Sequence, residues 1–286
     1  MTTLAMANFL ERLGHRVVQT ESSYWYDVHR YFYLNFPHHR LVNPNANELS
    51  QLFKGFYAGV RYFGPLTVPG RPSYAIICRD RQYSLDLLSP NSRSKVRRGL
   101  KHCKVERLEP KFVRERGKKA NEDTLRRIGI RDPYPWESYW RAVEESDCVE
   151  VWGAMMGKDL VAYLVAVLVE GCCEILIARS LAGFLKFYPN NALLFTVVHD
   201  MLSRAEIDQV FFGVESLEDV SSIDQFKESM GFVKSPIRQR VVLHPLLRPA
   251  LLSPLVVRAI SGLTNLQPQN EFWRKLNGIM TLSGSA

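Results

Sequence analysis

The densest chemistry in the sequence is a run of positive charge at residues 93–119. This run holds 12 Lys or Arg against three Glu, a balance of +9, whereas the whole chain carries +8. Arg93, Arg97 and Arg98 share one face of a predicted helix, and Lys101 follows one turn later. Three interpretations are open: a solvated face, a surface that binds the phosphates of a substrate or a tRNA, or a contact with anionic lipid. Phe112 is the only aromatic residue in the run, which argues against sequence-specific reading of RNA bases.

Three other side chains could accept a proton near neutral pH. Glu215 ends a predicted strand, Glu174 begins another, and His199 lies in a predicted helix. A general base must reach the attacking group and titrate in a useful range. The competing interpretations are a solvent-exposed loop carboxylate for Glu215 and a structural role for His199, which lies between the apolar Val198 and Met201.

Several other kinds of site are missing from the sequence. It contains no phosphate loop, dinucleotide-binding turn, nucleophile elbow or zinc-binding helix motif. His38 and His39 are the one close histidine pair, and neighbours on an extended chain point to opposite faces, so no metal site is expected. The five scattered cysteines favour a reducing compartment over a disulfide framework. With no uncharged apolar stretch of about 18 residues, the chain is expected to be cytoplasmic.

Residue patterns predict the elements that position these groups. In the first half we expect a helix with Asn47 as its N-cap, a hairpin, and the basic helix that begins near Arg93. From residue 121 onward we expect two short helices, three antiparallel strands, and then helix, strand, helix and strand. The predicted ranges are 5–13, 24–28, 31–36, 47–54, 73–79, 82–88, 148–155, 160–169, 173–180, 191–204, 209–216, 223–230 and 237–245, with short helices at 246–260 and 270–279.

One segment carries a more specific pattern. Residues 212–232 read FGVESLEDVSSIDQFKESMGF, in which a strand leads through an acidic loop to a helix with the pattern F-K-x-x-x-G-F. That pattern places Phe226 and Lys227 shortly before Gly231 and Phe232. With residues 188–202, this segment resembles the C-terminal half of FemABX-like and related GNAT-fold acyltransferases. The basic stretch 93–101 resembles the helix that joins the two halves in that group, so the resemblance covers residues 73–245.

The resemblance implies a donor site and a catalytic lysine. In such proteins the acyl donor binds where two parallel strands separate, which here would be strands 173–180 and 209–216. Lys227 matches the lysine thought to stabilise charge on the transferred carbonyl, an effect often worth a few kcal/mol; the alternative is a solvated helical lysine. Phe226 is its neighbour in the motif and is expected to contact substrate. Glu215 is the favoured base, because strand ends in this fold open onto the donor cleft.

The sequence also departs from ordinary acetyl-CoA enzymes of this fold. Those enzymes have a glycine-rich loop at a helix N-terminus that holds the CoA pyrophosphate. Between Ser180 and Ala192 this chain has only Gly183. The donor is therefore left open between acyl-CoA and an aminoacyl-tRNA.

Together these features predict an α+β protein with a GNAT-like fold, in which helices flank a mixed, mostly antiparallel sheet. Two related lobes are expected, a degenerate one at 1–120 and a better-marked one at 121–245, with a helical tail at 246–286 packed on the body. The predicted function is N-acetyl or aminoacyl transfer to an amine on a small molecule or a cell-envelope precursor, without a metal. The alternative is a non-catalytic anion-binding or adaptor protein, since fold alone does not decide function.

Overall fold

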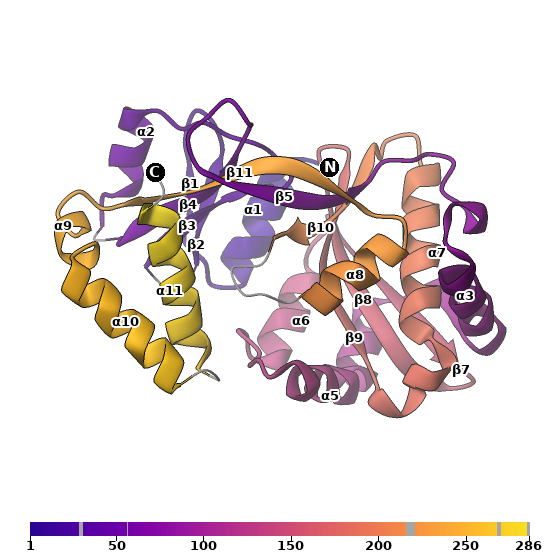
Figure 1. Ribbon diagram of the computed structural model, residues 1–286. Coiled ribbons are helices and arrows are strands. Elements are labelled where there is room, and N and C mark those ends of the chain that lie inside the picture. The colour runs from indigo at the N-terminus through magenta and orange to yellow at the C-terminus, as the bar shows by residue number, and fades with distance from the viewer. Residues whose placement is uncertain (29–30, 56, 216–220, 268–269, 285–286) are drawn as a thin grey trace. The chain divides into compact units, whose positions relative to one another are not determined.

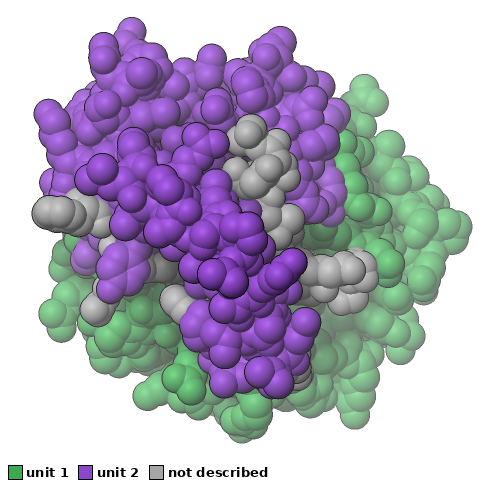
Figure 2. Space-filling model, turned by 60° about the vertical axis from the view of Figure 1, so that its left-hand side comes forward, with its two compact units in different colours: residues 1–13, 76–213, 221–234 green, residues 14–75, 214–220, 235–286 purple. Residues whose placement is uncertain are grey.

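The computed structural model describes residues 1–28, 31–55, 57–215, 221–267 and 270–284 (Figure 1). These residues form helices and eleven strands, and the strands pair in a mixed, mostly antiparallel arrangement, which confirms the expected α+β class. The chain divides into two compact units that are discontinuous in sequence (Figure 2). Unit 1 comprises residues 1–13, 76–213 and 221–234, and unit 2 comprises residues 14–75, 214–220 and 235–286. The lobe boundaries expected at 120 and 245 stay a prediction.

Unit 2 is built on five strands in the order β1-β2-β3-β4-β11. These strands are β1 (Val17–Gln19), β2 (Tyr24–Val28), β3 (Phe32–Phe36), β4 (Gly59–Gly64) and β11 (Val233–Leu243), whose first two residues belong to unit 1. Neighbours are antiparallel except for the parallel pair β3 and β4. Large buried aromatic side chains, among them Trp25, Tyr33 and Tyr62, form the hydrophobic core against which these strands pack.

The helices of unit 2 are α2 (Ala46–Leu52), α9 (Arg248–Leu251), α10 (Pro254–Leu266) and α11 (Glu271–Gly284). The expected N-cap Asn47 is wrong. Asn45 caps α2 instead, because its side chain accepts bonds from the first-turn amides while the Glu48 carboxylate accepts the Asn45 amide proton, a capping box. In the tail, Ile279 of α11 packs against Val241 and Leu243 of β11.

Unit 1 contains strands in the order β10-β9-β8-β7-β6. They are β6 (Lys104–Arg107), β7 (Val149–Met156), β8 (Asp159–Val169), β9 (Cys172–Ser180) and β10 (Gln209–Val214), whose last residue belongs to unit 2. The trio β7, β8 and β9 is antiparallel, as predicted. Helix α7 (Pro189–Ser203) then carries the chain across the sheet, so that β10 returns parallel to β9.

The other helices of unit 1 are α1 (Thr3–Arg12), α3 (Pro90–His102), α4 (Pro110–Arg116), α5 (Lys118–Ile128), α6 (Trp136–Glu144) and α8 (Ser221–Ser229). Strand β5 (Arg71–Cys78) has residues 71–75 in unit 2 and residues 76–78 in unit 1. The predicted strand at 82–88 is wrong. This segment turns at Asp80, whose carboxylate accepts the Gln82 amide proton, and then forms a short 3-10 helix, η1 (Leu85–Leu87).

Candidate functional site

Strands β9 and β10 separate soon after they begin. Their parallel register contains three residue pairs, Gln209 with Cys172, Val210 with Cys173 and Phe211 with Glu174. Strand β9 continues to Ser180 and β10 to Val214, so both run on past the last pair. Beyond Phe211 the described ladder between these two strands has ended, so their facing backbone groups are not bonded to each other there. This is the strand separation that the sequence led us to expect for a donor site.

A bulge in β9 accompanies the separation. Val165 of β8 pairs with Ile177, while the next residue, Ala166, pairs with Ile175, so Leu176 is an extra residue without an opposite partner on β8. A bulge bends its strand and increases the local twist. The bulge lies one residue beyond the first unpaired position, Ile175, and it gives a physical cause for the departure of β9 from β10.

Lys227 reaches β10 just where the two strands have parted. Its side chain lies on α8, and the residue is only 8% exposed. The ammonium nitrogen lies 5.0 Å from the centre of the Phe212 ring and 3.3 Å from Asp224 Oδ1. A Cβ built at Gly213 would lie 4.0 Å from the same nitrogen, and Gly213 has a φ of +97°, which glycine tolerates best. Lys227 is therefore a buried cation, and the interpretation of it as a solvated lysine is wrong.

Burial changes the protonation of this lysine. Loss of solvation lowers the pKa of Lys227 below its ordinary value of 10.5, and the nearby Asp224 carboxylate opposes that shift. An ammonium group in a desolvated setting acts strongly on negative charge that develops beside it. The position suits electrostatic stabilisation of an oxyanion.

The other predicted site residues lie on several different elements. Glu215 lies in unit 2, where its amide donates to Tyr74 O at 2.8 Å and its carbonyl accepts a bond from Gln239 Nε2 at 3.2 Å. Phe226 is half-buried on α8, and the ring in contact with the Lys227 ammonium is that of Phe212 instead. Glu174 is buried in the β9 ladder, and His199 is exposed on α7 beside Phe195. The roles proposed for Glu215 and Phe226 remain predictions.

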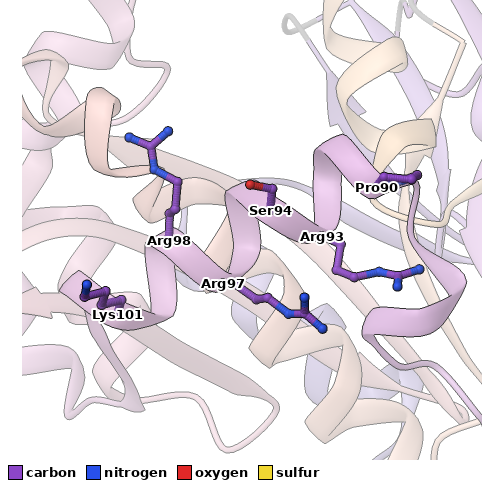
Figure 3. Close-up of a pocket in the computed structure, with 6 residues that line it drawn as sticks. All are labelled: Pro90, Arg93, Ser94, Arg97, Arg98 and Lys101. Atoms are coloured by element: carbon purple, nitrogen blue, oxygen red, sulfur yellow. The ribbon is translucent and has the colours of Figure 1, made fainter.

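The basic residues of α3 come together around one concavity. Pro90, Arg93, Ser94, Arg97, Arg98 and Lys101 line a hollow of about 410 Å³ (Figure 3). The helix buries Ser92, Val96 and Gly99 on its opposite side, so the long cationic side chains are left facing outward. A Cβ at Gly99 would lie 2.6 Å from Tyr188 O, so this glycine permits the close contact of α3 with the start of α7. We call this surface the α3 groove.

The four cations of the groove are not equivalent. Arg93 is held by Asp86, at 3.5 Å, and by the carbonyls of Asp86 and Leu88, each at 3.2 Å. Arg98 stacks over the Tyr188 ring with its guanidinium carbon 4.9 Å from the ring centre. Within the described part of the chain, Arg97 and Lys101 form no ion pair. These two cations have charge available for a ligand.

Tyr188 is a residue that sequence reasoning missed. It lies far beyond the end of the basic run, yet its ring supports both Arg98 and Lys95. It adopts a left-handed conformation, with φ +57°, at the start of α7. The basic helix is therefore accompanied by an aromatic ring from a distant segment, which the composition of 93–119 did not show.

The loop that would cradle a CoA pyrophosphate has a different form here. Residues between β9 and α7 form a 3-10 helix, η2 (Ala182–Phe187). The Asp123 carboxylate accepts the Ala182 amide proton at 2.6 Å, and the amides of Phe184 and Tyr188 are bonded to Leu181 O and Leu185 O. A carboxylate and internal hydrogen bonds thus occupy donors that a pyrophosphate would need. These residues do not fit that group in the usual mode.

This architecture is similar to that of several solved structures. No protein-family model matches the sequence, and no curated protein matches it either. Among solved structures, the C-terminal domain of a protein assigned as lysylphosphatidylglycerol synthetase from Agrobacterium fabrum gives a TM-score of 0.61 at 12% identity, covering 88% of this chain and 92% of that one. FemX gives a TM-score of 0.56 at 12% identity, with 85% and 92% covered. A GCN5-related N-acetyltransferase from Kribbella flavida gives a TM-score of 0.50 at 9% identity, with 86% and 96% covered.

The chain has the GNAT fold. The resemblance expected from residues 73–245 is confirmed at the level of structure, although identities of 9–12% establish the fold alone. The separated strands β9 and β10 are the pair for which the sequence predicted a donor site, and that site stays a prediction. None of the helices described here has the length and apolar character needed to cross a bilayer.

Proposed function

We propose that this protein transfers an acyl or aminoacyl group to an amine acceptor. The observation that supports it is the position of the Lys227 ammonium, buried against Phe212 and Gly213 where β10 has left β9. A donor carbonyl bound at the free strand edge would have this cation beside its oxygen. Negative charge forms on that oxygen when the amine attacks, and a preorganised cation stabilises it.

The proposed reaction balances as an ordinary acyl transfer. The amine nitrogen attacks the carbonyl carbon and forms a C–N bond, and the bond from that carbon to sulfur or oxygen of the donor breaks. The proton released by the amine passes to a general base, for which Glu215 is the candidate, and the leaving group takes up a proton. Lys227 keeps its proton throughout and acts through its charge.

The α3 groove suggests how the donor is held. Acyl-CoA and aminoacyl-tRNA both carry phosphates, and Arg97 and Lys101 offer cations without an ion-pair partner in the described chain. The bonded amides of η2 disfavour a pyrophosphate at the usual loop. We therefore favour an aminoacyl-tRNA donor over acyl-CoA, with the acceptor amine on a small molecule or a cell-envelope precursor.

A donor comparison tests the proposal. The full chain is incubated with acetyl-CoA or with charged tRNA, together with a panel of amines, and N-acylated products are measured by mass spectrometry. The expected result is product from charged tRNA that depends on Lys227. Binding of tRNA without transfer to any amine would favour the non-catalytic anion-binding protein instead.

A further inference from the structure

Three buried hydrogen-bond donors in unit 1 have no partner among the described residues. They are Tyr139 Oη and Trp140 Nε1 on α6, and Tyr163 Oη on β8. Tyr139 is 9% exposed, and Trp140 and Tyr163 are fully buried. Their rings form one continuous cluster, with centres 5.6 Å apart between Tyr139 and Trp140 and 5.7 Å apart between Trp140 and Tyr163. Buried polar atoms are nearly always hydrogen-bonded, so three unpaired donors in one cluster require an explanation.

Arg179 adds a positive charge to this cluster. It lies directly opposite Tyr163 in the β8–β9 register, and directly opposite residues project from the same face of a sheet. Its Nε donates to Asn121 Oδ1 at 2.8 Å, and its Nη1 donates to Ala178 O at 3.2 Å. No carboxylate of the described residues pairs with this half-buried guanidinium. Asp132, the nearby acid, accepts a bond from Asn121 Nδ2 at 2.6 Å instead.

The unpaired groups are all donors. Burial is the main cause that raises the pKa of both phenols. The positive charge of Arg179 partly opposes it and the Asp132 carboxylate adds to it, so Tyr139 and Tyr163 keep their protons. Two phenolic O–H groups without acceptors of their own therefore lie near a guanidinium, and the unpaired indole N–H belongs to the same cluster of rings. A group that carries several acceptor oxygens and a negative charge would satisfy them together.

We propose that Tyr139, Trp140, Tyr163 and Arg179 form a binding site for a small oxyanion of the carboxylate or phosphate class. The site uses neither Lys227 nor the α3 groove, so it does not rest on the proposed transferase activity. Residues 129–135 connect α5 and α6 and contact the cluster, since the Tyr134 ring stacks on that of Tyr139 with centres 5.9 Å apart, and residues 131–133 are exposed. Gly129, in the left-handed conformation with φ +70°, begins this connection.

The test compares anions by thermal unfolding of the full chain. Sodium acetate, sodium phosphate and sodium chloride are titrated at equal ionic strength, and the midpoint Tm is measured. We expect a saturable rise in Tm with acetate or phosphate above that with chloride, and the stronger of the two identifies the ligand class. Tyr163→Phe and Arg179→Gln should abolish this rise, whereas Arg141→Gln, which removes an exposed cation of α6, should retain it.

A second measurement separates an unpaired phenol from a bonded one. Tyr83 is also buried, and its hydroxyl donates to Met230 O at 2.7 Å, so Tyr83→Phe should lower Tm by leaving that carbonyl unpaired. In chloride alone Tyr163→Phe should leave Tm unchanged or raise it by a few degrees. The proposal is overturned if acetate and phosphate act no differently from chloride, if both variants keep the response, or if Tyr163→Phe lowers Tm as Tyr83→Phe does.

Discussion

Two cationic regions of unit 1 differ in their exposure to solvent. At β10, one ammonium, that of Lys227, is buried beside Phe212 and 3.3 Å from the Asp224 carboxylate, and its pKa is lowered. At α3, several cations stay in contact with water, and of the four in the groove only Arg93 forms an ion pair within the described chain. A buried charge acts strongly over a short range, while exposed charges act weakly, additively and with strong salt dependence. The contrast separates a candidate for chemistry from a candidate for binding.

The largest effect should come from Lys227→Met. This change keeps an apolar stem against Phe212 and removes the charge, so we expect turnover to fall by on the order of 100- to 1000-fold, as when one oxyanion donor is removed. Single-turnover rates with saturating charged tRNA measure it. Lys234→Met, which removes an exposed lysine just beyond α8, is the matched control and should retain the rate. Equal decreases in both variants would show that Lys227 has no effect on turnover beyond that of an exposed lysine.

A smaller effect, on affinity alone, is expected from Arg97→Gln combined with Lys101→Gln. For each phosphate that the variant no longer neutralises, the slope of log affinity against log salt should become shallower by about 0.7–0.9. Titrations of tRNA across salt concentrations measure the slope, and turnover at saturation should be unchanged. Lys118→Gln with Lys119→Gln removes the same charge from exposed positions outside the groove. If this control pair reduces the slope as much, the whole run 93–119 acts only as a diffuse charge.

The sequence predicted only some of the features of these two regions. The F-K-x-x-x-G-F pattern and the charge count located Lys227 and the basic helix, because both signals are local in the chain. The bulge at Leu176, the early end of the β9–β10 ladder and the Tyr188 ring beneath Arg98 arise from tertiary contacts that no local pattern encodes. The strand predicted at 82–88 failed for the same reason, since the Tyr83 phenol is drawn to the Met230 carbonyl. The capping box of α2 was readable and was missed.

A substitution at Gly213 tests the backbone conformation beside the Lys227 ammonium. A φ of +97° is unfavourable for any residue with a Cβ, so Gly213→Ala should destabilise the protein by about 1–2 kcal/mol. The added methyl would also lie 4.0 Å from the Lys227 ammonium and remove part of its space. Chemical denaturation measures the first effect. Gly183→Ala, at a position with no close neighbour and an ordinary φ, should leave stability unchanged.

The smallest effect is a dependence on pH that only the buried cation should show. The folded pKa of Lys227 is lowered from 10.5, so over the interval between the folded and unfolded pKa values the unfolded chain binds more protons than the folded chain. The contribution of Lys227 to stability is therefore least favourable below its folded pKa and improves as pH rises toward 10.5.

Activity should change in the opposite direction, because only the protonated lysine stabilises an oxyanion. We expect turnover to decline as pH rises through the folded pKa of Lys227 while stability attributable to this residue increases, with Lys227→Met showing neither trend. Rates and denaturation midpoints measured on the same samples from pH 7 to about 10 would reveal this crossing. Parallel trends in wild type and Lys227→Met would show that the buried ammonium is not the group that titrates.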